Sequence, residues 1–452
     1  MSSSFQPYDV VVAGAGISGL TCAWALRRAG LRVMVLEAGE DIGGCISSVR
    51  RDGCIADGGP QTFAATAALM DVVAGLGLDD KVQRAKAGAP FFFAHGRLEP
   101  APTSPGAFIA SPLLSPVGKL RLLAEPFIGA RASSDDESVA DFATRRGGRA
   151  VVDALVRPMI GGIFAGDPSR LSVRSAFPGL VESERRYTSV MIGALARRQK
   201  TGSRRPAPIS FAGGNDTLTE ALAATLGPDV RLGVSVTELV LRGARMELVY
   251  DGASSGSVVA RHAVLATPAY ESGRLLSGLE PEAAAALASI AYAPIAQVAL
   301  SYRLEEVEAE LRGFGFLSGE ESSLRILGCT WNSSMFADRC PRERVLVTAF
   351  LGGTSDPTVA SLRDDEIVAI AHRDLQRALG IDVPPFVIAG FRWERAIPQY
   401  ELGHAQRLAT IATGMSRLPQ ASLIGNYFAG PSVPDCISGA LAAAERVKSV
   451  LS

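Results

Sequence analysis

The chain has 452 residues, 47% of them hydrophobic, a length that suggests about three domain-sized units. Its 45 Lys and Arg residues nearly balance 46 Asp and Glu residues, and both signs are interspersed, so no basic surface favours nucleic acid. Because no run of about eighteen apolar residues occurs and the N-terminus lacks a secretory signal, we expect a cytoplasmic protein that does not span a bilayer.

The first predicted elements form a dinucleotide-binding unit. Residues 8–13 (YDVVVA) predict a strand buried on both faces, followed by the spacing GxGxxG, a helix that stops at Gly30, a strand over residues 31–36 and an acid. The first glycine permits a tight turn, the second lets the backbone approach phosphate, and the third allows close helix packing. The acid can accept hydrogen bonds from the ribose. The predicted contacts are Gly14, Ala15, Gly16, Ile17, Ser18, Gly19, Glu37 and Ala38.

The next segment carries the glycine pairs Gly43-Gly44 and Gly58-Gly59. Backbone without side chains can lie against a long cofactor there, although loop flexibility is the alternative reading. The segment resembles the flavin amine oxidase superfamily, whose pattern E-A-x-x-R-x-G-G continues the dinucleotide fold. Here Asp41 stands in place of the usual arginine, and Cys45 replaces an arginine found in many amine oxidases. The resemblance implies FAD as the cofactor.

Residues 105–130 are unusually apolar, with prolines throughout and charges only at Lys119, Arg121 and Glu125. Such a segment is too apolar for an ordinary solvated region and too interrupted to span lipid. It could lie in a membrane interface, cover an apolar substrate, or belong to the core.

Later segments return to the dinucleotide-binding part. Residues 210–226 predict a glycine turn and a helix, 230–241 a strand, and 260–268 a buried strand. Near the end, residues 423–427 predict a strand, 428–433 a loop, and Pro434 begins a helix. The positive end of that helix dipole would stabilise negative charge on a reduced flavin, and an Ala-rich packing helix is a compatible reading. Between them, residues 275–384 mix strands (296–302 and 344–351) with a helix (364–379).

The remaining chemistry-bearing residues show no pattern of their own. The six cysteines have no CxxC pair or metal-ligand spacing, so we expect free thiols, no disulfide and no metal site. The four histidines suggest neither a triad nor a metal site, and each is read as structural. The chemistry must then come from the cofactor.

Several segments together resemble the protoporphyrinogen oxidase family, in order and nearly from end to end. They are 162–167 (GIFAGD), 292–296 (YAPIA), 313–317 (GFGFL), 329–331 (CTW), 350–353 (FLGG), 398–400 (PQY), 425–427 (GNY) and 434–437 (PDCI). The resemblance implies an α/β fold with a discontinuous Rossmann-like FAD-binding domain (1–85, 206–274 and 385–452). It further implies a mixed-sheet substrate domain (86–103 and 275–384) and a helical membrane-binding insertion (104–205) that contacts the membrane from one side.

The resemblance also implies an activity. Family enzymes remove six electrons from protoporphyrinogen IX by hydride transfers to flavin N5, with O2 as acceptor and hydrogen peroxide as product, in haem biosynthesis. No protein nucleophile is required. By matching segments, Phe314, Leu317 and Phe350 would surround the macrocycle. The further implied FAD contacts are Gly43, Gly44, Cys45, Gly59, Pro60, Gln61, Thr62, Val236, Trp393, Pro431, Ser432 and Val433.

Two departures from the family leave the substrate open. Pro90 stands where many members have an arginine thought to pair with a substrate propionate, and Gln61 stands where some have arginine. Arg97 could substitute, although a solvated hairpin arginine is the alternative. Coproporphyrinogen III, with four carboxylates, is therefore a competing substrate. Two other functions stay open: oxidation of an amine or another cyclic metabolite, and a carrier that retains FAD without turnover. The oligomeric state also stays open, a homodimer included, as does peripheral contact with the cytoplasmic face of a membrane.

Overall fold

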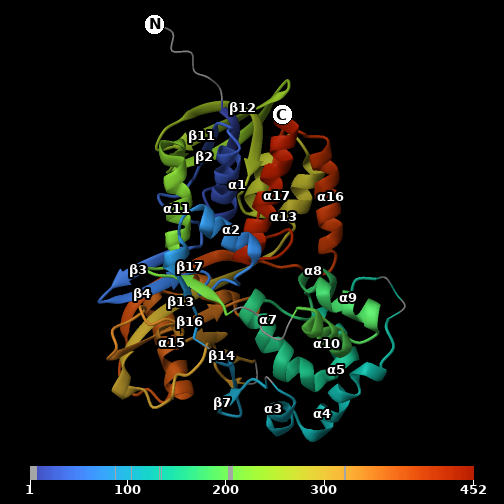
Figure 1. The fold of residues 1–452 in the computed structure, drawn as a ribbon, viewed down its shortest axis with the longest axis vertical. Coiled ribbons are helices and arrows are strands. Elements are labelled where there is room, and N and C mark those ends of the chain that lie inside the picture. The colour runs from blue at the N-terminus through green and yellow to red at the C-terminus, as the bar shows by residue number, and fades with distance from the viewer. Residues whose placement is uncertain are drawn as a thin grey trace.

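The computed structural model describes residues 8–86, 88–102, 104–131, 133, 135–201, 207–319 and 322–452. Figure 1 shows one sheet with its helices in the upper half, near the C-terminus, and a second sheet in the lower half beside a group of helices. The strand β17 (Phe386–Pro398) runs across the middle, where these parts meet. The architecture is the mixed α/β fold that the sequence predicts.

The first sheet has the order β10-β11-β12-β1-β2-β9, with β18 beside β12. Its centre is β1 (Tyr8–Ala13), which pairs in parallel with both β12 (Gly256–Leu265) and β2 (Val33–Leu36). Val10 and Val12 pack into one apolar cluster and Val11 into another, so both faces of β1 are covered as its apolar run predicts. The other strands are β9 (Val230–Arg231), β10 (Val234–Arg242), β11 (Arg245–Gly252) and β18 (Ala421–Leu423).

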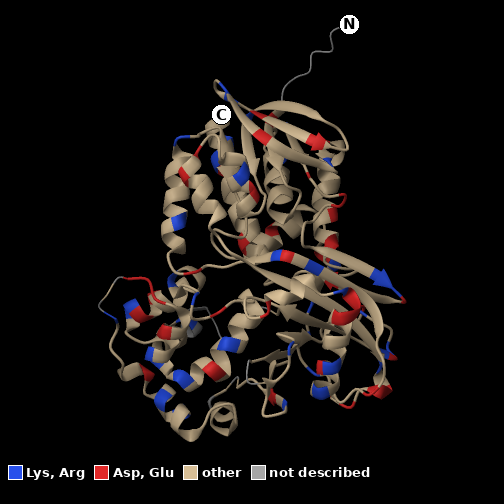
Figure 2. Ribbon diagram, turned by 180° about the vertical axis from the view of Figure 1, so that it is seen from behind, with Lys and Arg blue, Asp and Glu red and all other residues tan. Residues whose placement is uncertain are grey.

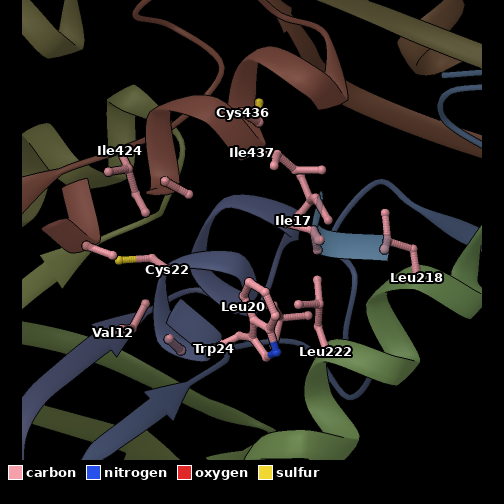
Figure 3. Packing of buried hydrophobic residues seen from close by; sticks show 14 of the residues in the cluster. Val12, Ile17, Leu20, Cys22, Trp24, Leu218, Leu222, Ile424, Cys436 and Ile437 are labelled. Atoms are coloured by element: carbon pink, nitrogen blue, oxygen red, sulfur yellow. The ribbon is translucent and has the colours of Figure 1, made fainter. Parts of the chain in front are cut away.

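One face of this sheet is covered by three helices: α1 (Ile17–Arg28), α11 (Asp216–Leu226) and α17 (Val433–Leu451). Figure 3 shows side chains of all three helices in one cluster, among them Leu20 of α1, Leu222 of α11 and Ile437 of α17. The other face packs against α12 (Ala269–Leu276), α13 (Pro281–Ala288) and α16 (His404–Ser416). Segments separated by more than two hundred residues thus share one core, so the dinucleotide-binding part is discontinuous, as predicted.

Three predicted boundaries are wrong. The second strand begins at Val33, two residues late, and the strand expected over 230–241 is two strands. Gly233, with φ of +66°, separates β9, which pairs in parallel with β2, from β10, which pairs antiparallel with β11. The strand expected over 423–427 lies earlier, as β18, because Gly425 has φ of +156° and the chain leaves the sheet there.

The second sheet has the order β17-β13-β16-β15-β14-β6-β7. Residues 386–398, which the sequence analysis groups with the dinucleotide-binding part, form its edge strand β17 and pair with β13. One face packs against α15 (Asp364–Leu379), a helix with the predicted bounds. The other strands are β6 (Phe91–Ala94), β7 (Arg97–Pro100), β13 (Tyr292–Arg303), β14 (Gly315–Ser318), β15 (Gly328–Thr330) and β16 (Arg344–Gly352).

Two short ribbons and two further helices complete the junction of the sheets. The ribbons pair β3 (Ser47–Arg51) with β4 (Cys54–Gly58), and β5 (Val82–Arg84) with β8 (Ile209–Phe211). The helices are α2 (Ala67–Gly75) and α14 (Asn332–Met335).

The predicted helical insertion is helical in the structure. Its helices are α3 (Pro105–Ala110), α4 (Pro116–Leu123), α5 (Val139–Gly147), α6 (Arg149–Val151), α7 (Arg157–Phe164), α8 (Val173–Ala176), α9 (Pro178–Tyr187) and α10 (Val190–Thr201). In the ribbon of Figure 2 the far end, made by α3 and α4, carries few charged residues, whereas acidic and basic residues both occur in the other helices of the insertion. No helix within the described ranges is long and apolar enough to cross a bilayer.

Candidate active site

The three glycines of the first turn have three different surroundings. A Cβ on Gly14 would lie 2.9 Å from the Ala266 carbonyl oxygen, and one on Gly19 would lie 1.9 Å from the Gly14 carbonyl oxygen. A Cβ on Gly16 would meet no protein atom within 4 Å. The first and third glycines therefore permit close packing, while the second leaves open the path where a phosphate would approach the backbone.

Glu37 follows β2, and its side chain turns back toward the glycine turn at Ala15. Its Oε2 accepts a hydrogen bond from the Ala15 N–H at 2.6 Å, and Oε1 accepts one from the Gly39 N–H at 2.8 Å. These bonds fix the carboxylate at the mouth of the turn, with the neighbouring Ala38 exposed. This is the position in which an acid would bind ribose hydroxyls.

The glycine pair after Glu37 lies against the same turn. The Gly43 N–H donates to the Ala15 carbonyl oxygen at 2.9 Å, and a Cβ on Gly44 would lie 3.4 Å from the Gly16 Cα. Cys45 keeps exposed surface, and desolvation by the surrounding protein raises the pKa of its thiol. The structure thus brings together two predicted cofactor segments.

The start of α17 lies close to the start of α1. Ser432 caps α17, its Oγ accepting from the Asp435 N–H at 3.3 Å, and Pro434 occupies the first turn as predicted. Ser18 of α1 hydrogen-bonds to the Cys436 thiol, while burial raises the pKa of that thiol. Two helix N-termini therefore point into one region, which suits the anionic groups of a flavin dinucleotide.

The segment containing Gly59, Pro60, Gln61 and Thr62 is held from the second sheet. The buried side chain of Gln297, on β13, clamps Gly59: its Oε1 accepts from the Gly59 N–H at 2.9 Å and its Nε2 donates to the Gly59 carbonyl at 2.8 Å. The Asn332 amide donates to Gln61 Oε1 at 2.6 Å. Gln61 is therefore used to join the two sheets.

A buried ion pair supports the same segment from behind. Asp57 and Arg339 are each 1% exposed at the side chain, with Oδ2 and Nη2 separated by 3.0 Å. Asp57 Oδ1 also accepts from Ser48 at 2.6 Å and from the Asn215 N–H at 2.8 Å. Burial raises the pKa of Asp57, and the Arg339 charge opposes that shift.

The predicted substrate residues Leu317 and Phe350 lie in one row across the second sheet. Leu317 is opposite Gly328, Gly328 is opposite Phe350, and Phe350 is opposite Gln297. Directly opposite residues point to the same side of a sheet, so this row runs from Leu317 to the Gly59 clamp on the face away from α15. An apolar wall is thus continuous with a predicted cofactor segment.

A helix faces the same row. A Cβ on Gly162 of α7 would lie 2.4 Å from Leu317 Cδ2, and one on Gly161 would lie 3.8 Å from Leu327 Cδ2. The helix can approach the row this closely because both residues lack a side chain.

Four other predicted residues lie outside this row. One of them, Trp393, stays on the same face of the sheet beside the Gly59 clamp, because its stacking partner Phe391 is directly opposite Gln297. Phe314 packs with Met335 and Phe336 instead of lying in the row. Arg97, 69% exposed, is ion-paired with Glu99 on the edge strand β7. Trp393 on β17 stacks on Phe391, and the Val236 carbonyl accepts a hydrogen bond from Arg274 Nη2 at 2.9 Å. Their proposed contacts with substrate or FAD stay predictions.

The histidines make no catalytic arrangement in the described part of the chain. Burial lowers the pKa of His262 and of His404 to about 4, so both are neutral at pH 7. His404 Nε2 contacts the Tyr427 carbonyl oxygen at 2.9 Å, and its ring stacks on Tyr400. Within the described ranges no group of acidic, His or Cys side chains could hold a metal ion.

Gln297, Asn332 and Arg339 are the site residues that the sequence analysis missed. Gln297 carried a usable signal, because it is the one polar residue in the run 293–300 (APIAQVAL), and a buried polar group needs a partner. Asn332 and Arg339 stand in a polar stretch, where a further polar residue carries no signal, and their contacts with Gln61 and Ser210 span more than a hundred residues.

The residues present fit FAD. The unobstructed approach at Gly16, the oriented Glu37 carboxylate and the two converging helix N-termini suit a dinucleotide pyrophosphate and ribose. The clamped segment at Gly59 adds a second contact region, as a long cofactor requires.

Comparison with known proteins agrees with this geometry. The family model described as flavin-containing amine oxidoreductase matches residues 17–448. Protoporphyrinogen oxidase of rice chloroplasts (Oryza sativa subsp. japonica) is 33% identical, over 98% of this chain and 89% of its own. Coproporphyrinogen III oxidase of Bacillus subtilis is 29% identical, over 96% of each chain. A crystal structure from Exiguobacterium sp. 255-15 superposes over 100% of both chains with a TM-score of 0.84 and 24% identity. The chain belongs to the flavin-containing amine oxidoreductase family.

Proposed function

We propose that the protein is an FAD-dependent oxidase that converts protoporphyrinogen IX to protoporphyrin IX with O2 as acceptor, in haem biosynthesis. The observation that carries the proposal is the row Leu317, Gly328, Phe350 and Gln297, an apolar wall that ends at the clamped Gly59. A flat, largely apolar macrocycle could lie against such a wall with one edge toward the cofactor. The relative named protoporphyrinogen oxidase supports this substrate.

In this proposal FAD supplies the redox chemistry by accepting hydride from the macrocycle. The protein residues bind and orient. Leu317 and Phe350 hold the rings, Gly59 and Gln61 fix the distance between the two binding regions, and the start of α17 stabilises negative charge. The two buried histidines are neutral and bonded within the protein, so no side-chain base is assigned.

Coproporphyrinogen III is the second candidate substrate. Two observations favour it: Pro90 replaces an expected arginine, and a relative of similar length is named coproporphyrinogen III oxidase. Arg97 shares its side of the β6–β7 hairpin with Phe92, which is opposite Leu317, but Glu99 offsets its charge. A carboxylate of either substrate would compete with Glu99 for Arg97.

The deciding experiment is a side-by-side turnover assay. Purified enzyme receives protoporphyrinogen IX or coproporphyrinogen III in air, and porphyrin fluorescence is followed against autoxidation. We expect the higher kcat/KM for protoporphyrinogen IX. A preference for coproporphyrinogen III would transfer the assignment to that substrate, and no fluorescence above autoxidation with either would remove the proposal.

We also propose that α3, α4 and the turn after them contact a membrane surface from the cytoplasmic side. Val117, Leu120, Leu123 and Phe127 are 75%, 68%, 50% and 90% exposed, and their spacing places them in one stripe. Lys119 and Arg121 turn away from solvent to bond the Ile109 and Arg145 carbonyls. The stripe is therefore apolar and lacks the basic face typical of anionic-lipid binders.

A buried polar anchor on the opposite side keeps the stripe exposed. Glu125 accepts from Arg146 Nε at 2.7 Å, from Ser189 at 2.5 Å and from the Val190 N–H at 2.9 Å. Phe127 lies two residues further on and points outward. Sedimentation with phosphatidylcholine vesicles tests the contact. The double variant Leu120→Ser/Phe127→Ser should stay in the supernatant instead of sedimenting with the vesicles. The matched control Ile192→Ser/Leu195→Ser, on the exposed side of α10, should sediment with the vesicles as wild type does.

A further inference from the structure

Two buried cysteines far apart in sequence meet between the two sheets. Cys54 begins β4 and Cys340 lies before β16, and their Sγ atoms are 2.8 Å apart. This separation is inside the roughly 3.5–4.0 Å of an ordinary non-bonded contact. The residues are 1% and 8% exposed.

The backbone holds the two sulfurs opposite each other. The Ile55 N–H donates to the Arg339 carbonyl at 2.9 Å, and a Cβ on Gly53 would lie 3.1 Å from Pro341 Cγ. The two segments of the chain therefore run antiparallel here. Cys54 is directly opposite Cys340, next to the hydrogen-bonded pair Ile55 and Arg339. Side chains approach most closely at such a position, which suits a disulfide.

The surroundings favour a thiolate on one sulfur. The Ser301 hydroxyl lies 3.9 Å from Cys54 Sγ and 3.7 Å from Cys340 Sγ. Hydrogen bonding to Cys340, and then to Ser301, lowers the pKa of Cys54 against the effect of burial, and the charge of Arg344 acts in the same direction. The Nε and Nη2 atoms of Arg344 are buried and have no hydrogen-bond acceptor, so this cation has unused capacity to stabilise an anion.

We propose that Cys54 and Cys340 form a reversible redox pair that peroxide closes to a disulfide. The Cys54 thiolate attacks one oxygen of hydrogen peroxide, the O–O bond breaks, and the hydroxide that leaves takes up the proton released by the thiol, giving a sulfenic acid and one water. Cys340 then attacks that sulfur, the S–O bond breaks, and a second water leaves. Two thiols and one peroxide thus become one disulfide and two waters, a two-electron oxidation of the sulfurs.

The disulfide would join the two binding regions. Cys54 lies three residues before Asp57 and Cys340 follows Arg339, so the bond would sit beside the Asp57–Arg339 ion pair that supports the Gly59 segment. It would also close a loop of 286 residues, and a cross-link over so long a loop stabilises by restricting the unfolded chain. The oxidase reaction proposed above would release peroxide, but the redox pair does not depend on it.

Peroxide treatment of the reduced holoenzyme tests the proposal. Excess hydrogen peroxide is removed, the protein is denatured so that maleimide reaches the buried thiols, and intact mass and tryptic peptides are read without reductant. We expect a loss of two hydrogen atoms, two fewer labelled thiols, a linked peptide pair containing Cys54 and Cys340, and a Tm higher by a few degrees that dithiothreitol reverses.

Three variants complete the test. Cys54→Ser and Cys340→Ser should each lose the linked peptide and the Tm shift, while Cys329→Ala, which removes another buried thiol, should keep both. Six labelled thiols after peroxide, or oxygen added to cysteine in place of a linked peptide, would overturn the proposal. A linked peptide made by other cysteines would also overturn it.

Discussion

Gln297 is the residue whose removal most sharply separates cofactor binding from general stability. Gln297→Leu keeps the approximate volume but removes both hydrogen bonds to Gly59. The Gly59 N–H then has no acceptor, which costs about 1–3 kcal/mol, while its carbonyl keeps a hydrogen bond from Gln61 Nε2 at 3.2 Å and loses about 1 kcal/mol. We therefore expect the free energy of unfolding to fall by about 2–4 kcal/mol.

The same change should weaken FAD binding. If the binding-competent arrangement of the Gly59 segment loses about 2 kcal/mol relative to others, the apparent Kd rises about 30-fold. Kd is measured by titrating FAD into apoenzyme and following the quenching of flavin fluorescence, and stability by urea unfolding of the apoenzyme.

A second buried glutamine provides the matched control. Gln399 also makes two backbone hydrogen bonds, to the Phe164 carbonyl at 2.8 Å and the Ile397 carbonyl at 2.9 Å. Gln399→Leu should lose comparable stability and keep FAD affinity within about threefold. If Gln297→Leu is destabilised as expected yet binds FAD like wild type, the clamp does not position the cofactor segment.

Three further predictions follow from single positions. Gly16→Val should give colourless protein whose Tm nearly equals that of the wild-type apoprotein, because its Cβ meets no protein atom. Gly19→Val should lower the yield of folded protein, because its Cβ would lie 1.9 Å from a carbonyl oxygen. A yellow Gly16→Val variant would contradict the first expectation. Phe350→Ala should lower kcat/KM for protoporphyrinogen IX about 10–100-fold with normal flavin content, through the loss of a large apolar contact, and an unchanged kcat/KM would remove Phe350 from the site. Burial raises the pKa of Glu125, but the hydrogen bonds that this carboxylate accepts outweigh burial and hold its pKa below the usual value. The stabilisation by Glu125 is therefore full at neutral pH and is lost as pH falls below about 4.5 through the folded-state pKa. The urea midpoint of wild type should thus drop with acid more steeply than that of Glu125→Gln.

Local patterns predicted the parts of the fold that local interactions determine. The strand 8–13, the helix 364–379 and the Pro434 helix start follow from short-range periodicity and capping, and the structure confirms them. The split between β9 and β10 did not follow, because apolar residues stand on both sides of Gly233, and neither the positive φ of that glycine nor the different partner strands can be read from the local pattern.

The candidate site also combines local features that the sequence predicts with long-range contacts that it does not. The glycines and Glu37 are close in sequence and carry a known spacing, so their arrangement around Ala15 could be predicted. The clamp of Gly59 by Gln297 joins residues 238 positions apart and depends on the register of β13, β16 and β17, which no local pattern encodes.

Under the proposed function, a flavin held beside the Leu317–Phe350 wall would take electrons directly from a porphyrinogen. Anaerobic mixing of the flavin-loaded enzyme with protoporphyrinogen IX tests it in one turnover, by following the flavin absorbance and then admitting air. We expect bleaching of the flavin band, followed in air by its recovery and the appearance of porphyrin fluorescence. A flavin band that stays oxidised in the presence of both protoporphyrinogen IX and coproporphyrinogen III would contradict it.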